Sequence, residues 1–316
     1  MTTSQTDWQQ LAWAGIKLLA PSDWYVTQLR VTQNESYIRM EDDDMVRFEL
    51  SCATVSPIQQ INLREHAEAI LSKMAKEAKK RGEEFSQSVD TKLVGRHQVK
   101  GRDVLTFSWA GRYIGEGMLW WCGKCGKVLV AHVIGVKGER LKELAKKLFT
   151  SISDHSEDEW HSWKLFGLDL KVHSSMRLCG HKVEAGFVRF QFKRGDEDSL
   201  EVARWSTADL MLKGTTLDKL AAQVLKEHLK KFEISYRHVQ FGSSSHEGIE
   251  LYGKAKMPLK TFQLFLRQLT KRSLMPKLRG LMWKCDNTNR LFLVLAITAS
   301  EVVSEFEHVI NSFKCH

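Results

Sequence analysis

One stretch of this chain of 316 residues occurs twice. The segment GMLWWCGKCGKVLVAHVIG, which begins at Gly117, aligns without a gap with GLMWKCDNTNRLFLVLAIT, which begins at Gly280. In this alignment Trp120 meets Trp283, and an apolar run follows in both copies. Solenoid repeats are roughly 20 to 50 residues long, whereas a period of roughly 150 residues is that of an ordinary domain. The repeat therefore indicates duplication of a whole domain.

Each copy also opens in the same way, with an acidic residue and a tryptophan (Trp8 and Trp160) before a glycine and an apolar stretch. The run 154–159 between the copies is acidic and polar and contains no apolar residue, which is typical of a short exposed linker. We therefore assign residues 1–155 to the first copy and residues 156–316 to the second.

Both copies show the same pattern of strands and helices. Alternating apolar and polar residues predict half-buried strands, as at 187–192. Apolar residues at helical spacing predict a helix inside each copy, at 63–81 and 217–230, and a closing helix, at 139–149 and 301–313. The predicted fold class is α+β, with two tandem copies of an antiparallel β-sheet domain flanked by helices.

The opening GIKLLAPSDW, with Gly15, Pro21 and Trp24, resembles the start of PsbP-like domains. This is the fold of the photosystem II extrinsic protein PsbP and of a Ran-binding nuclear import factor. The order of strands, helix, strands and closing helix agrees in both copies, although His173 and Met176 replace the proline and the tryptophan in the second. The resemblance implies a non-catalytic module that binds another macromolecule, and it supplies no catalytic residues.

The composition is that of an ordinary globular protein, with 43% hydrophobic and 27% charged residues. No window approaches the roughly 18 unbroken apolar residues of a membrane span. The N-terminal residues MTTSQTDWQQ lack the charged and then apolar order of a signal peptide. We therefore expect a cytoplasmic protein, in which the six scattered cysteines are reduced thiols.

Two of the cysteines, Cys122 and Cys125, are close enough in sequence to be half of a zinc site. The second copy has Cys285 and Thr288 at these positions, and no second CxxC or HxxxH completes four ligands. We therefore interpret CGKCGK as a hairpin loop whose glycines allow the turn, and we predict no metal and no cofactor.

No motif of a known enzyme class stands out, including GxGxxG, the P-loop, HExxH and GxSxG. The sequence therefore predicts no enzyme. The alternative is an enzyme with a pocket between the copies, in which Cys122 or His132 is the reactive group.

The copies differ most before the second tryptophan strand, where an insertion near 254–280 lengthens the second copy. The net charge of +9 is also uneven, with +3 in residues 1–155 and +6 in the remainder. If helical, the insertion places Phe262, Phe265, Leu266 and Leu269 on one stripe. The predicted partner-binding residues are its basic side chains: Lys254, Lys256, Lys260, Arg267, Lys271, Arg272, Lys277 and Arg279.

These features predict an intracellular, non-catalytic binding or scaffold protein. It would recognise a macromolecular partner, most simply an acidic protein, through a sheet face and the basic insertion. The main alternative is a nucleic-acid-binding accessory protein in which the same lysines and arginines contact phosphates. A blander interpretation is an extended hairpin whose charges are merely solvated.

Overall fold

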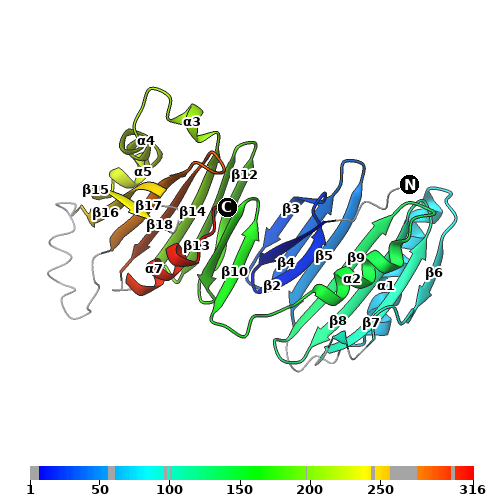
Figure 1. The fold of residues 1–316 in the computed structure, drawn as a ribbon. Coiled ribbons are helices and arrows are strands. Elements are labelled where there is room, and N and C mark those ends of the chain that lie inside the picture. The colour runs from blue at the N-terminus through cyan, green and yellow to red at the C-terminus, as the bar shows by residue number, and fades with distance from the viewer. Residues whose placement is uncertain are drawn as a thin grey trace, which may run out of the picture. The chain divides into compact units, whose positions relative to one another are not determined.

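The structure is a computed structural model of the chain. It describes residues 7–55, 61–95, 98–99, 102–196, 198–242, 246–256, 276–299 and 303–316. The chain forms two compact units, Met1–Asp158 and Glu159–His316, and each is described by itself (Figure 1).

The first unit consists of a β-hairpin, a seven-stranded antiparallel sheet and two α-helices within its described residues. The hairpin is β1 (Trp8–Trp13) and β2 (Ile16–Pro21). The sheet is made of β3 (Tyr25–Val31), β4 (Glu35–Glu41), β5 (Val46–Thr54), β6 (Ser86–Val89), β7 (Arg102–Ala110), β8 (Ile114–Cys122) and β9 (Lys127–Gly135). The helices are α1 (Leu63–Lys80) and α2 (Leu141–Ser151).

The second unit repeats this plan. Its hairpin is β10 (Trp160–Leu165) and β11 (Leu168–His173). Its sheet is made of β12 (Arg177–Glu184), β13 (Phe187–Arg194), β14 (Asp198–Ser206), β15 (Phe232–Phe241), β16 (His246–Ala255), β17 (Lys277–Cys285) and β18 (Arg290–Thr298). Its described helices are α3 (Ala208–Met211), α4 (Leu217–Val224), α5 (Lys226–Leu229) and α7 (Val303–Ser312).

The strand order is the same in the two sheets. In the first unit it is β3-β4-β5-β9-β8-β7-β6, and in the second it is β12-β13-β14-β18-β17-β16-β15. Each number in the second order is larger by nine, so every strand of one sheet has a counterpart in the other. The two buried tryptophans of the sequence repeat, Trp120 and Trp283, lie on the counterpart strands β8 and β17.

The hairpins that open the two units have the same turn. Ala14 and Gly15 both have positive φ, of 48° and 81°, and Phe166 and Gly167 repeat this with 53° and 75°. Two consecutive left-handed residues match the right-handed twist of the flanking strands, and glycine adopts this conformation without steric cost. The glycine that marks the start of each copy in the sequence is therefore required by the turn.

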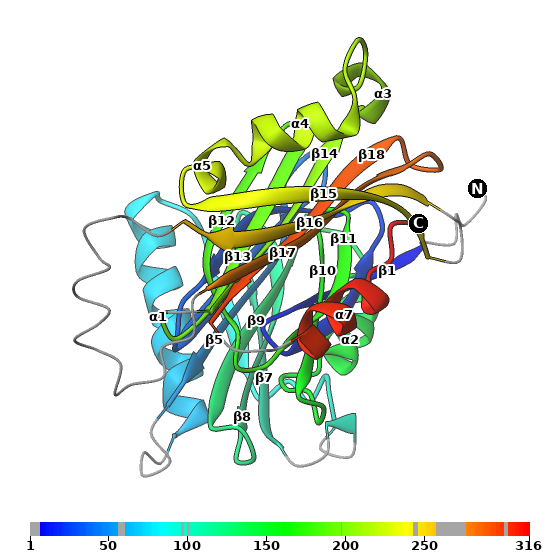
Figure 2. The same cartoon turned by 90° about the vertical axis from the view of Figure 1, so that its left-hand side faces the viewer.

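Helices cover both faces of the first sheet. Helix α1 packs Ala67 and Leu71 against Phe107, Trp109 and Leu119 of β7 and β8. Helix α2 packs on β8 and β9 and lies on the opposite face of the sheet from α1 (Figure 1). The corresponding two faces in the second unit carry α4 on one side and α7 on the other (Figure 2).

The predicted α+β class is wrong, because antiparallel strands dominate both units. The first unit contains nine strands and two α-helices within its described residues, so its fold is mostly β. The predicted helix at 217–230 is broken at Leu225 into the short helices α4 and α5. The sequence also left several strands without bounds, including β3 and β7, whose weak alternation hides them.

None of the described helices is long and apolar enough to cross a membrane. The six cysteines form no disulfide, as expected from the sequence.

Candidate functional site

Four of the eight predicted partner-binding residues lie in the described part of the chain. Lys254 is in β16 and Lys256 follows it, whereas Lys277 and Arg279 are in β17. The other four, and the predicted apolar stripe, lie outside the described residues: Lys260, Arg267, Lys271 and Arg272, with Phe262, Phe265, Leu266 and Leu269.

The additional length of the second copy is located at one hairpin. In the first unit β7 and β8 are joined by residues 111–113. Their counterparts in the second unit, β16 and β17, are joined by residues 256–276. The described ends of β16 and β17 are therefore the base of the basic insertion, and the first unit has nothing equivalent there.

The base of this hairpin has an exposed, positively charged face. Residues directly opposite each other in an antiparallel pair point to the same side of the sheet. Tyr252 is opposite Arg279, and Lys254 is opposite Lys277. Arg237 of β15 lies on the same side. We call Arg237, Tyr252, Lys254, Lys277 and Arg279 the basic strand face.

The arginines of the basic strand face are paired with carboxylates, but its lysines are not. Arg237 and Arg279 each form an ion pair with a glutamate. Within the described residues, no such pair involves Lys254 or Lys277, although both are exposed and lie directly opposite each other. Like charges at opposite positions destabilise a sheet. Glu233 of β15 lies on the other side of Lys254, so Lys277 is the lysine of this pair that faces no carboxylate on a neighbouring strand.

Tyr252 lies at the centre of the basic strand face and is 37% exposed. The guanidinium carbons of Arg237 and Arg279 each lie 5.8 Å from the centroid of its ring. Its hydroxyl donates a hydrogen bond to Glu250 Oε2 at 2.7 Å, and this bond, together with burial, raises the pKa of Tyr252. The side chain thus presents an aromatic face flanked by two guanidinium groups.

A second group of polar residues gathers at the end of β8 in the first unit. Arg102 begins β7 and lies opposite Cys122, which ends β8. Asp154 follows α2 and accepts hydrogen bonds from Arg102 Nη2 at 2.7 Å and from the Trp120 indole N–H at 3.2 Å. His155 Nδ1 lies 3.8 Å from Cys122 Sγ. We call Arg102, Cys122, Asp154 and His155 the first corner.

Asp154 is ionised in the first corner. Burial opposes its ionisation, but the hydrogen bonds and the positive charge of Arg102 outweigh burial and hold the pKa of Asp154 below its usual 3.8. Cys125 Sγ lies 3.7 Å from Asp154 Oδ2. Burial and the charge of Asp154 raise the pKa of the Cys125 thiol to about 12. The first corner is therefore organised around the buried carboxylate of Asp154, whose negative charge is neutralised by Arg102.

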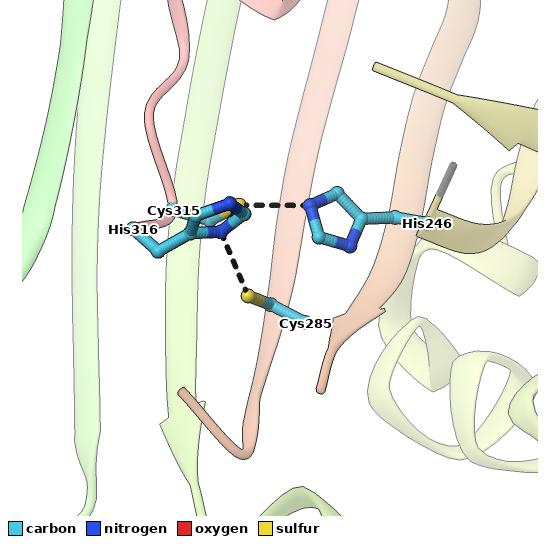
Figure 3. Close-up of side chains that lie close together, drawn as sticks. All are labelled: His246, Cys285, Cys315 and His316. Carbon is cyan, nitrogen blue, oxygen red and sulfur yellow. Dashed lines mark hydrogen bonds between the residues drawn. The ribbon is translucent and has the colours of Figure 1, made fainter. Parts of the chain in front are cut away.

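The second unit has two histidines and two cysteines at the corresponding place, His246, Cys285, Cys315 and His316, which we call the second corner (Figure 3). His246 Nε2 lies 3.2 Å from Cys315 Sγ. His316 Nδ1 lies 3.4 Å from Cys285 Sγ and 3.3 Å from Cys315 Sγ. All four ligand atoms lie within 4.8 Å of one another.

Burial sets the protonation of the second corner. It lowers the pKa of His246, and the nearby His316 adds to this effect, so the His246 imidazole is neutral near pH 7. Burial also raises the pKa of the Cys315 thiol to about 11. Cys285 is fully buried, whereas His316 is exposed.

The two corners occupy equivalent positions. His246 is two residues beyond the Gly248–Trp283 pair, and so lies opposite Cys285 as Arg102 lies opposite Cys122. The closing helices dock alike, since Ser151 and Ser312 each accept a strand N–H at 2.9 Å. Asp154 and Cys315 each come three residues after the serine of their own closing helix. The equivalent pairs are Arg102 and His246, Cys122 and Cys285, Asp154 and Cys315, and His155 and His316.

Neither corner is predicted from the sequence. The prediction that Asp154 lies in an exposed linker is wrong, because this side chain is fully buried. The alignment of Cys125 with Thr288 gives no indication of partners from distant segments. A signal was present, because aligning the ends of the closing helices makes His155 coincide with His316, beside the repeated cysteines Cys122 and Cys285.

Of the residues named for an alternative enzyme, Cys122 is buried and His132 is half-buried. His132 lies edge-on to the rings of Phe107 and Trp109, with centroids 5.6 Å and 5.3 Å away. Burial lowers the pKa of His132 to about 4, so it is neutral near pH 7. Cys122 is 1% exposed and belongs to the first corner. The CGKCGK segment forms the turn between β8 and β9, as the sequence predicted.

Comparisons with known proteins identify no family. No family model matches the chain, and no curated protein matches it in sequence. Among solved structures, the chain is similar to the T6SS immunity protein TplEi from Pseudomonas aeruginosa complexed with an "L" peptide, with a TM-score of 0.35 and 9% identity over 99% of each chain. It is also similar to a chain of the Tle4-Tli4 complex, with a TM-score of 0.33 and 8% identity over 98% of this chain and 97% of the other. At these TM-scores the function is argued from the residues of this chain alone.

Proposed function

We propose that this chain is a non-catalytic protein-binding protein, and that the basic strand face of its second unit docks an acidic surface of a partner. The observation that carries this proposal is the exposed pair Lys254 and Lys277, which lie opposite each other and form no ion pair within the described residues, although Glu233 of β15 lies across from Lys254. Like charges at opposite positions disfavour a sheet, and Glu233 offsets this at Lys254 but not at Lys277. An anionic partner offsets the repulsion.

The surroundings of the lysine pair favour a protein over a nucleic acid. Tyrosine and arginine are enriched in protein interfaces, and Tyr252 lies between two arginines here. The glutamates that pair with these arginines, Glu250 and Glu307, are part of the same surface. Their carboxylates repel a phosphate backbone but allow the alternating charges of a protein surface.

The two units also differ at the hairpin that carries the basic strand face, and this difference supports a docking role for the second unit. The counterpart hairpin of the first unit closes with the short turn 111–113 and carries Tyr113 beside Arg112. A domain that only needed to fold could have kept this short turn. The described ends of this longer connection, Lys256 and the start of β17, adjoin the basic strand face.

Photo-cross-linking tests the location directly. Tyr252→p-benzoylphenylalanine places the probe at the centre of the basic strand face, and Tyr113→p-benzoylphenylalanine is the matched control, because the two tyrosines are 37% and 38% exposed. We expect a discrete cross-linked protein from the Tyr252 position alone in the native host. Equal cross-linking from both positions would contradict the proposal.

Charge reversal tests the mechanism. Lys254→Glu with Lys277→Glu should abolish capture of that cross-linked protein, whereas Lys73→Glu with Lys76→Glu on the exposed side of α1 makes the same change in charge and should leave capture intact. Treating the lysate with nuclease before capture distinguishes the alternatives. Loss of capture after nuclease would assign the surface to nucleic acid instead.

A further inference from the structure

The second corner has the donor set and spacing of a tetrahedral metal site. Zinc binds cysteine sulfur at about 2.3 Å and histidine nitrogen at about 2.0 to 2.1 Å, so two ligand atoms on one tetrahedron lie about 3.3 to 3.8 Å apart. The three sulfur–nitrogen distances in the second corner are 3.2, 3.3 and 3.4 Å. Small shifts of the four side chains would bring their ligand atoms to tetrahedral positions around an ion.

Hydrogen bonding alone accounts for the second corner poorly. Each thiol can donate one proton, so Cys285 and Cys315 can make at most two S–H···N bonds to neutral imidazoles. The structure has three sulfur–nitrogen contacts, two of which meet at His316 Nδ1 and two at Cys315 Sγ. One cation at the centre satisfies all of them at once.

A buried N–H group supports an anionic ligand at position 315. Trp283 is 1% exposed, and its indole N–H interacts with the Cys315 thiol but makes no hydrogen bond of normal geometry within the described residues. Its counterpart Trp120 donates to the Asp154 carboxylate at 3.2 Å, and Cys315 occupies the position of Asp154. Leaving a buried N–H without a partner costs about 1 to 3 kcal/mol. A metal-bound thiolate at Cys315 supplies the acceptor that the neutral thiol does not.

The first corner closes the same position with an ion pair, although the ligand-type atoms of Cys122, Cys125, Asp154 and His155 also lie within 4.8 Å of one another. Its carboxylate, Asp154, is neutralised by Arg102, and Arg102 is the counterpart of His246. In the second unit both members of this ion pair are replaced by ligand-type residues, while the cysteine and the second histidine are kept. A cation in the second corner would therefore supply the positive charge that Arg102 supplies in the first.

We propose that His246, Cys285, Cys315 and His316 bind one zinc ion in the second unit, and that the Arg102–Asp154 ion pair takes the place of a metal in the first. Two thiolates and two imidazoles favour zinc over calcium or magnesium, which prefer oxygen ligands. Four protein ligands describe a structural site, in which no position is left for a substrate. The ion ties β16 and β17 to the segment that follows α7.

An entry path to the site exists. His246, Cys315 and His316 line a surface hollow of about 560 Å³, whereas Cys285 lies beneath them. Arg237 and Glu250 line the same hollow, so the site lies close to the basic strand face. Zinc binding would therefore also fix the strands that carry the proposed docking surface, although the zinc site is argued independently of it.

Metal content of the full-length chain tests the proposal. The protein is stripped with a chelator, incubated with zinc alone under reducing conditions, and passed through gel filtration before elemental analysis. We expect one zinc per chain. Cys285→Ser with Cys315→Ser should lower the zinc affinity at least about 100-fold. Mutating a group that only hydrogen-bonds to a metal ligand already lowers metal affinity by about 10- to 100-fold. Cys122→Ser with Cys125→Ser is the matched control and should still bind one zinc.

A second measurement does not depend on whether the variant Cys285→Ser with Cys315→Ser folds. Cobalt(II) added to the wild-type chain should give the intense visible bands of tetrahedral coordination with sulfur ligands, and His246→Gln should weaken them while leaving both thiols in place. Absence of zinc from the reduced wild-type chain, or unchanged zinc content in the serine variant, would overturn the proposal. Two zinc ions per chain would overturn the role assigned to Arg102 and Asp154.

Discussion

The first and second corners are the same piece of architecture with different chemistry. In both, a cysteine ends the tryptophan strand and a histidine follows the closing helix. The first corner adds Arg102 and Asp154, which neutralise each other. The second has His246 and Cys315 at those positions, which cannot do so near pH 7, because burial keeps the imidazole neutral and the thiol protonated.

This difference shows that a buried polar corner can be balanced in two ways. An arginine and a carboxylate provide opposite charges from the chain itself, so the first corner needs nothing from solution. A set of neutral ligands requires an external cation before its donors and the Trp283 N–H are all satisfied. One duplicated scaffold can thus carry a self-sufficient version and a metal-dependent version of the same contact.

The largest effect is expected from Asp154→Ala, which tests the first half of the comparison. It leaves the half-buried Arg102 guanidinium without its carboxylate and the Trp120 N–H without its acceptor. Removing one partner of a buried ion pair destabilises a protein by about 3 to 5 kcal/mol. Hydrogen exchange of first-unit peptides in urea should show this loss, and added zinc should not reverse it. A loss below about 1 kcal/mol would show that the first corner is not held by this ion pair.

The same ion pair predicts a pH dependence. The pKa of Asp154 is lower in the folded state than its usual 3.8, so its contribution is complete above that value and is lost as the pH falls below it. The stability of the first unit should therefore decline below about pH 4, and Asp154→Asn should remove that part of the decline. An identical pH profile in the variant would contradict the assignment.

The next largest effect comes from converting one corner into the other. Arg102→His with Asp154→Cys gives the first corner the two cysteines and two histidines of the second. We expect a second zinc per chain, and zinc-dependent recovery of the stability lost with the ion pair. At free zinc about 100-fold above the dissociation constant, binding contributes about 2.7 kcal/mol. A chain that still binds one zinc would show that the corners differ in more than these two residues.

A smaller effect is expected at the indole N–H. Trp283→Phe removes the donor to Cys315 but keeps the aromatic packing against Phe292 and Phe313. Outer contacts of metal ligands are worth about 10- to 100-fold in affinity, so zinc binding should weaken by that factor in a chelator competition. Trp120→Phe is the matched variant of the first unit, and it should leave the zinc affinity unchanged. Equal effects of the two variants would contradict a role for Trp283 at the metal.

The smallest effect concerns the lysine pair of the second unit, for which the first unit has no counterpart. Lys277→Glu replaces a like-charge pair with an opposite-charge pair across β16 and β17, and its partner on β18 is the uncharged Thr298. Urea denaturation should show a gain of about 0.2 to 1 kcal/mol, while partner binding weakens. Lys73→Glu on α1 should produce neither change. A loss of stability in Lys277→Glu would mean that the lysines do not repel each other in the fold.

Local patterns predicted a large part of the fold. The predicted helix at 63–81 corresponds to α1, which begins after Asn62, whose side chain caps its N-terminus. The glycines at the opening turns and the buried tryptophans are also where the repeat placed them. These features depend on residues close in sequence or on burial of large apolar side chains, and both leave clear signals.

The corners depend on distant residues and left weaker signals. Cys285 and Cys315 are separated by β18 and α7, and His246 comes from a strand before the long connection 256–276. No spacing rule for zinc ligands covers such distances, because the sheet register and the docking of the closing helix bring them together. Asp154 was misplaced for a related reason: an acidic residue in a polar run suggests exposure unless its buried partner is known.

X-ray absorption at the zinc edge tests the central claim most directly, because it reports the ligands of the metal in the intact wild-type chain. The account predicts one zinc per chain with two sulfur ligands at about 2.3 Å and two nitrogen ligands at about 2.0 to 2.1 Å. A coordination shell of oxygen and nitrogen atoms alone, or a chain that binds no zinc, would contradict it.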